Sequence, residues 1–194
     1  MGFNPVTVDD QSLASLIGSR LCHDLVSPIG AIGNGLELLR MTQETSPELD
    51  LVEEAVKVAQ ARIRLFRLAF GAANAEQSIS AGEFTQALDA LSANGRISVQ
   101  TDSPAAMPRF AARRLALAAL CAETAMAWGG DIFVDPSGIS AQAKRLKLDD
   151  DLWQALAAGR AAETLGSSTV HIALLAGSGP VSLALGDTSL TIRI

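Results

Sequence analysis

The chain is poor in cysteine and aromatic residues, and its acidic residues outnumber its basic ones. The cysteine count and the net charge each argue against a class of protein. Tyrosine is absent, aromatic residues make up 4% of the 194 residues, and there are only two cysteines. Cys22 and Cys121 lie far apart in unlike contexts, which indicates a reduced, cytoplasmic protein rather than a disulfide scaffold. The net charge of −6 disfavours nucleic-acid binding. No apolar run is long enough to cross a bilayer, and residues 1–10 lack the features of a signal peptide, so we expect no membrane association.

The first part of the chain predicts two long helices. Apolar residues recur at helical spacing from about Asp9 to Arg40, and they form one stripe. Ser46 and Pro47 predict the start of a second helix, as N-cap and first helical residue, and this helix ends near Gly71. The stripe of the first helix comprises Leu13, Ile17, Leu21, Leu25, Pro28, Ile32, Leu36 and Leu39. The second helix carries a heptad seam at Leu49, Val52, Val56, Ala59, Ile63, Phe66 and Phe70.

Two helices cannot bury two complete apolar faces against each other. We therefore expect a second copy of the helical hairpin to complete a four-helix bundle in a homodimer. In the alternative, the second half of the chain covers the hairpin. The length and regularity of the seam favour the dimer.

The second half of the chain predicts a separate α+β domain. Residues 72–82 are small and polar and predict a linker, so we divide the chain into a helical hairpin, residues 1–74, and a mixed domain, residues 75–194. Within it we expect helices over 83–91, 108–128 and 149–165, strands over 96–101, 131–135 and 139–146, and a closing hairpin of 181–185 and 189–194. Residues 168–176 fit either a helix or a strand. The pattern predicts a sandwich with helices on one face of a mostly antiparallel sheet.

One histidine of the first helix is placed for phosphoryl chemistry. On a helical wheel, His23 lies roughly opposite the centre of the apolar stripe, which exposes its imidazole. Asp24 can accept a hydrogen bond from one ring nitrogen and leave the other as a nucleophile. Arg20 and Ser27 lie one turn before and one turn after, where they can neutralise or hydrogen-bond phosphoryl oxygens. In the alternative, His23 and Arg20 are solvated side chains without a role, and the Ser27 hydroxyl bonds the backbone.

The residues around His23 predict a surface for a partner. The same outer face of the helix carries Ser19, Gly30, Asn34 and Glu37. Gly30 and Gly33 lower helix stability by about 1 kcal/mol each relative to alanine, and the docking of a partner's helix explains them better than hairpin stability does. Arg62, Phe66 and Arg67 of the second helix lie at a height that borders this patch, although Phe66 also fits the seam.

The run His23-Asp24-Leu25-Val26-Ser27-Pro28 resembles the H-box of histidine-kinase dimerisation domains, which reads His-acid-x-x-polar-Pro. The longer segment Ser19–Leu39 resembles the ChpT-type histidine phosphotransferases of alphaproteobacteria. This resemblance implies a dimeric four-helix bundle and a C-terminal domain shaped like a histidine-kinase ATP-binding domain that no longer binds ATP. It also implies a phosphorelay, in which His23 accepts a phosphoryl group from a receiver-domain aspartate of a hybrid kinase and passes it to a response regulator.

The sequence also bears on nucleotide and metal binding. Residues 115–125 stand where a working ATP domain carries asparagines for magnesium, but they contain none, and Glu123 is their only carboxylate. No Asp-x-Gly-x-Gly loop occurs, and Gly177-Ser178-Gly179 fits a turn rather than a phosphate cradle. We therefore expect no bound cofactor and no autokinase activity, with Mg²⁺ supplied by the receiver domain during transfer. No cysteine or histidine cluster has metal-ligand spacing, and we expect Cys22 and His171 to pack.

Three hypotheses of function follow from these features. The first is a phosphorelay histidine phosphotransferase, a phosphoryl carrier without autokinase activity. The second is an ATP-dependent histidine kinase with a diverged nucleotide site, and the third is a non-catalytic dimer that binds receiver domains. A phosphatase role ranks lower, because Ser27 is a less natural group for orienting water than an amide.

Overall fold

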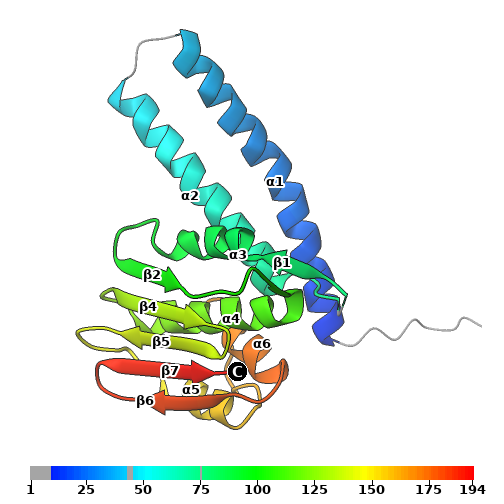
Figure 1. Ribbon diagram of the computed structural model, residues 1–194, viewed down its shortest axis with the longest axis vertical. Helices are drawn as coiled ribbons and strands as arrows, with labels where there is room; N and C mark the ends of the chain where they lie inside the picture. The colour runs from blue at the N-terminus through cyan, green and yellow to red at the C-terminus, as the bar shows by residue number, and fades with distance from the viewer. Residues whose placement is uncertain (1–9, 43–45, 75) are drawn as a thin grey trace, which may run out of the picture.

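The computed structural model describes residues 10–42, 46–74 and 76–194. Two antiparallel helices, α1 (Asp10–Thr42) and α2 (Pro47–Phe70), form a hairpin that rises from an α/β unit (Figure 1). Ser46 caps α2, because its side chain accepts a hydrogen bond from the Leu49 amide at 3.2 Å. Both predicted helices and the predicted start of the second are confirmed. Asp9, the predicted first residue of the first helix, lies outside the described residues.

The remaining elements form two sheets and the helices that cover them. They are β1 (Ser78–Ser80), α3 (Ala81–Leu88), a 3-10 turn η1 (Asp89–Leu91), β2 (Ile97–Thr101), β3 (Ala106–Pro108), α4 (Arg109–Ala125), β4 (Gly130–Asp135), β5 (Gly138–Gln142), α5 (Asp150–Ala157), α6 (Val170–Gly177), β6 (Ser182–Leu185) and β7 (Ser189–Arg193). The main sheet has the order β2-β4-β5-β7-β6 and is parallel only between β2 and β4. Helix α4 packs on β4 and β5, and α6 packs between α4 and α5 (Figure 1). The expected mixed fold with a mostly antiparallel sheet is confirmed.

Two predicted helices end earlier than expected. The helix predicted over 149–165 is α5 alone, because the chain turns at Gly159, whose φ of +65° favours glycine. The helix predicted to reach Trp128 ends at Ala125, since the next residue leaves helical geometry and Gly129 has a φ of +83°.

The segment 72–82, predicted as a linker, contains ordered structure. β1 pairs antiparallel with β3, and Ser80 and Glu83 form a capping box at the start of α3. The segment 168–176, which fits either a helix or a strand by sequence, contains helix α6. Both segments are short, so contacts with distant elements decide their conformation.

The face of α2 that packs against the α/β unit differs from the predicted seam. The side chains that pack in the core of the α/β unit are Ala61, Leu65, Leu68 and Ala69. These are not seam positions, and the seam residues Val52 and Phe66 remain 47% and 37% exposed. The second half of the chain therefore covers α2 along a strip beside the predicted seam.

Most of the predicted apolar stripe of α1 is exposed on this single chain. Ile17, Leu21 and Leu25 are 51%, 59% and 51% exposed, whereas Leu36 is buried. The side chain of Leu13 lies outside the described part. At the base of the hairpin, a Cβ atom on Gly18 would lie 2.8 Å from the Phe70 carbonyl oxygen, so this glycine allows the two helices to approach closely. Among the described residues, no helix is both long and apolar enough to span a membrane.

Candidate functional site

His23 is an exposed histidine of α1 held by the carboxylate beside it. Its side chain is 80% exposed, and its Nδ1 lies 3.2 Å from Asp24 Oδ1. The Arg20 Nε donates to the other carboxylate oxygen, Oδ2, at 2.8 Å. The hydrogen bond with His23, and then the Arg20 charge, lower the pKa of Asp24 below its usual value. Because an ionised carboxylate only accepts hydrogen bonds, the contact favours the tautomer of the neutral imidazole with its proton on Nδ1, and in that tautomer Nε2 has the lone pair that a nucleophile requires.

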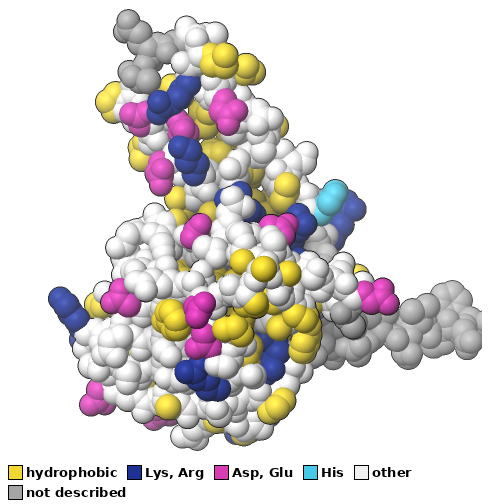
Figure 2. Space-filling model, in the orientation of Figure 1, with side chains coloured by type: hydrophobic (Ala, Val, Ile, Leu, Met, Phe, Trp, Pro, Cys, Tyr) yellow, Lys and Arg dark blue, Asp and Glu magenta, His cyan; other side chains and the backbone are white. Residues whose placement is uncertain are grey.

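A hollow of about 800 Å³ adjoins His23 where the hairpin meets the α/β unit. Its walls include His23 and Ser27 of α1, Arg67 of α2, Glu83 of α3 and Arg109 of α4. In Figure 2, a histidine side chain protrudes at this junction with basic side chains beside it. The hollow therefore brings together side chains from four helices around the imidazole.

Hydrogen bonds tie the walls of this hollow to one another. The Ser19 hydroxyl accepts from the Ala72 amide at 2.9 Å, which joins α1 to the segment after α2. The Arg109 guanidinium donates to the carbonyl oxygens of Arg67 and Ala72 at 3.2 and 3.4 Å. Ser19, predicted to bind a partner, thus also fastens the hairpin. Sequence reasoning missed Arg109 and Glu83, because only tertiary contacts bring them to His23.

The other residues of α1 predicted to contact a partner have different surroundings. Asn34 and Glu37 are exposed farther along the helix. Gly30 lines an apolar groove of about 250 Å³ between α1 and α2, and a Cβ atom there would meet no described atom within 4 Å. A Cβ atom on Gly33 would lie 2.8 Å from the Gln60 side-chain nitrogen of α2. Gly33 therefore faces the flexible end of Gln60 within the hairpin, and the docking of a partner's helix on this face stays a prediction.

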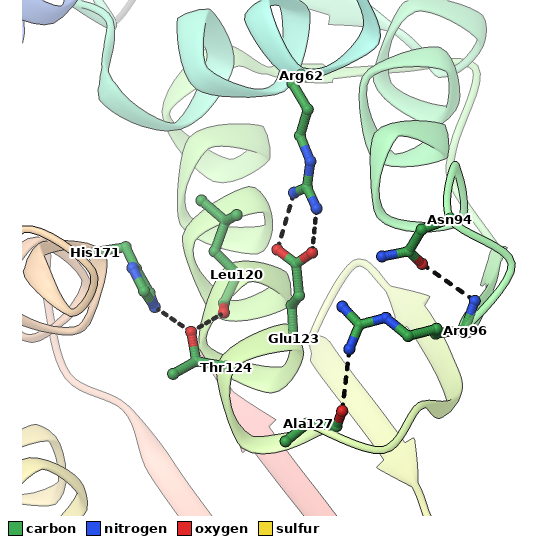
Figure 3. A network of polar contacts seen from close by, with 8 residues as sticks. All are labelled: Arg62, Asn94, Arg96, Leu120, Glu123, Thr124, Ala127 and His171. Carbon is green, nitrogen blue, oxygen red and sulfur yellow. Dashed lines mark hydrogen bonds and ion pairs between the residues drawn. The ribbon is translucent and has the colours of Figure 1, made fainter. Parts of the chain in front are cut away.

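Arg62 and Phe66 line a different hollow, of about 460 Å³, between α2 and α4. Arg62 forms a two-pronged ion pair with Glu123 of α4, with Nη1 2.9 Å from Oε2 (Figure 3). This pair is only 28% and 17% exposed, and it joins the hairpin to the second unit. Of the three residues of α2 expected beside the histidine, the structure places only Arg67 there.

His171 and the two cysteines are packed. The His171 Nε2 lies 3.0 Å from the Thr124 hydroxyl, which donates to the Leu120 carbonyl oxygen at 3.0 Å, so the ring nitrogen is the donor (Figure 3). Burial lowers the pKa of His171 to about 4, against a smaller opposing effect of Glu123. Burial also raises the pKa of the Cys22 and Cys121 thiols. Within the described ranges, no three His, Cys, Asp or Glu side chains are grouped to hold a metal ion.

Comparisons with known proteins agree on one family. The model of the histidine phosphotransferase C-terminal domain matches residues 81–178, half of the chain. The protein phosphotransferase ChpT of Brucella abortus (strain 2308) is 45% identical over 69 residues, which cover 36% of this chain and 33% of that protein. The match thus spans about a third of that relative's length. The solved structure of a bacterial phosphotransferase is similar with a TM-score of 0.63 and 25% identity, over 97% of this chain and 98% of that one.

Proposed function

The chain belongs to the histidine phosphotransferase family, and from this premise we propose that His23 relays phosphoryl groups between receiver domains. The donor is a receiver-domain aspartate of a hybrid histidine kinase, and the acceptor is that of a response regulator. The observation that carries the proposal is the exposed imidazole with its Nδ1 against Asp24, which leaves Nε2 open to a partner. A phosphoryl carrier must be both nucleophilic and accessible, and His23 meets both requirements.

The first transfer forms a nitrogen–phosphorus bond. The Nε2 lone pair of His23 attacks the phosphorus of the donor's aspartyl phosphate, and the phosphorus–oxygen bond breaks with its electron pair leaving on the donor carboxylate. The proton on Nδ1 stays hydrogen-bonded to Asp24, whose negative charge stabilises the phosphoimidazolium. The receiver's acidic pocket would hold the Mg²⁺, which would supply positive charge to the phosphoryl oxygens.

The second transfer reverses these bond changes. The acceptor carboxylate attacks phosphorus, the nitrogen–phosphorus bond breaks, and its electron pair returns to Nε2 of His23. The ring leaves as neutral imidazole because Nδ1 still carries its proton, which makes it a better leaving group than an imidazolate. Asp24 thus assists both directions by keeping that proton in place.

The exposed stripe of α1 supports the proposal of a homodimer. Ile17, Leu21, Leu25 and Ile32 are each about half exposed on one chain. Apolar patches of this kind mark protein interfaces, and a second hairpin of residues 1–74 offers the matching surface for a four-helix bundle. We also propose that residues 75–194 form a domain related to kinase ATP-binding domains without nucleotide binding. The ion pair between Arg62 and Glu123 supports this second proposal. Glu123 is the only carboxylate of α4, and the ion pair already engages it.

Labelling with a phosphorylated receiver tests the function of His23. The purified protein is incubated with Mg²⁺ and either a labelled receiver or labelled ATP, and the acid lability of any label is measured. The wild type and His171→Gln, which alters the other histidine of the chain, should acquire acid-labile label from the receiver. His23→Ala should acquire none while keeping the oligomeric state of the wild type. Label that persists in His23→Ala would overturn the proposal.

The same experiment separates the alternatives. Label from ATP alone would support a histidine kinase with a diverged nucleotide site. Receiver binding without label, which survives His23→Ala, would support a non-catalytic scaffold. Asp24→Asn tests the mechanism: we expect transfer to slow by roughly 10²-fold, the lower range for loss of a proton-positioning group, with receiver binding unchanged.

A further inference from the structure

Arg67 lies in the last turn of α2, beside the hollow that adjoins His23. Both side chains line this hollow, together with Ser27, Glu83 and Arg109. The charge of Arg67 also acts on groups of two neighbouring helices. Its charge opposes the burial that raises the pKa of the Cys22 thiol on α1, and it adds to the burial that lowers the pKa of Arg109 on α4. Arg67 therefore shares the hollow with side chains of the histidine-bearing helix and of the second unit.

The side chain of Arg67 forms no ion pair with a carboxylate in the part of the chain that the structure describes. Among the residues that the structure describes, the ion pairs within 4.0 Å engage Arg20, Arg40, Arg62 and Arg193 but not Arg67. Arg20, the other arginine near His23, is bound to Asp24 through its Nε. Of Arg20 on α1 and Arg67 on α2, Arg67 is thus the one without an ion pair to a carboxylate among the described residues.

The surroundings of Arg67 add positive potential and rigidity. Among the described residues, the Arg109 guanidinium donates to the backbone carbonyl oxygens of Arg67 and Ala72, which holds the last turn of α2, and it forms no ion pair within 4.0 Å. The hydrogen bonds from Ser80, and then the charges of Arg109 and Arg67, lower the pKa of Glu83, so Glu83 balances part of this positive charge. Glu83 is the one acid among the described residues that line the hollow, and its carboxylate accepts from the Ser80 amide and hydroxyl at 3.1 and 2.8 Å. Two guanidinium groups and one carboxylate leave a net positive charge in the hollow that the imidazole also lines.

We propose that Arg67 is a catalytic residue that binds the oxygens of the phosphoryl group while His23 carries it. A guanidinium presents paired donors that match two phosphoryl oxygens, and its charge stabilises the charge that spreads over these oxygens during transfer. The inference rests on the proposed function of His23 and adds the group that neutralises the phosphoryl on this chain. It also gives a reason for the position of this guanidinium on α2, since the arginine on α1, Arg20, is bound to Asp24.

The first test compares Arg67→Gln with Arg64→Gln. Arg64 lies one turn earlier on α2, is exposed, and does not line the His23 hollow, so its variant makes the same change in net charge nearby. We expect Arg67→Gln to slow transfer from a labelled receiver by roughly 10²-fold, the loss typical of one oxyanion-stabilising donor, and Arg67→Lys to recover part of it. Arg64→Gln should stay within about 2-fold of the wild type, because surface charges are screened by salt. Equal rates for the two glutamine variants would overturn the proposal.

The second test reads the phosphoryl group directly. The phosphorylated protein is separated from the receiver, and the pH dependence of its ³¹P NMR shift is recorded. A guanidinium on the phosphoryl oxygens stabilises the dianion, so the phosphoryl pKa should be lower in the wild type and in Arg64→Gln than in Arg67→Gln. A variant that merely folds less well would not move this pKa. If the wild type is labelled but all three proteins titrate alike, the role of Arg67 is refuted while the function of His23 stands. If the wild type takes no label from any cognate receiver, the proposed function itself fails.

Discussion

Mild acid should weaken the fold of this protein through a single buried side chain, that of His171. The residue is only 6% exposed, and its Nε2 donates to the Thr124 hydroxyl 3.0 Å away. Protonation would place a charge on Nδ1 within the hollow between α2, α4 and α6, where burial disfavours it. The pKa of the ring accordingly falls from 6.5 to about 4 in the folded state.

The sign and size of the effect follow from proton linkage. As the pH falls below 6.5, the pKa of His171 in the unfolded chain, the unfolded chain binds a proton at this ring. The folded chain does not bind this proton until the pH nears 4. The stabilising effect of the neutral ring is therefore complete above the unfolded pKa and is lost as the pH falls through this window. Between about pH 7 and about pH 5.5 the linkage relation gives a loss of about 1 kcal/mol, and its limit in stronger acid is about 3 kcal/mol.

Urea unfolding of the full chain at these two pH values measures the loss. The His171→Gln variant keeps a donor near the position of Nε2 but cannot be protonated, so its free energy of unfolding should change much less. His23→Gln is the matched control, because His23 is the only other histidine and is largely exposed. All proteins are compared at one concentration, since any oligomer would make stability depend on concentration. If His171→Gln loses as much stability as the wild type, the reasoning about His171 is refuted.

Two further predictions concern α1. Leu21→Glu should dissociate the proposed homodimer in analytical ultracentrifugation, because it places a charge in the exposed stripe, whereas Leu38→Glu, 64% exposed and outside this stripe, should leave the mass unchanged. A dimer that survives Leu21→Glu would contradict the proposed bundle. Gly18→Ala should destabilise the fold by about 1–3 kcal/mol in urea, because the new methyl group meets the Phe70 carbonyl oxygen. Gly30→Ala, which has open space, should instead stabilise it by up to about 1 kcal/mol, and equal effects at both glycines would argue against close packing at Gly18.

The sequence by itself determined the elements whose signals are local. The cap at Ser46, the proline after it and the spacing of apolar residues define α1 and α2, because each signal acts within one or two helical turns. The same spacing placed His23 on an exposed face, and adjacency alone placed Asp24 beside its ring. These features depend on the helix and not on what the helix packs against.

The tertiary structure decided how the charged residues of α2 are used. Arg62, Phe66 and Arg67 lie within about one and a half turns, and sequence spacing could not tell which of them faces His23. The packing of Ala61, Leu65, Leu68 and Ala69 into the core settles the rotation of α2. This rotation turns Arg62 toward Glu123 of α4 and Arg67 into the hollow with Arg109. Such pairings join residues that are tens of positions apart, so they depend on which apolar strip the core buries rather than on any local pattern.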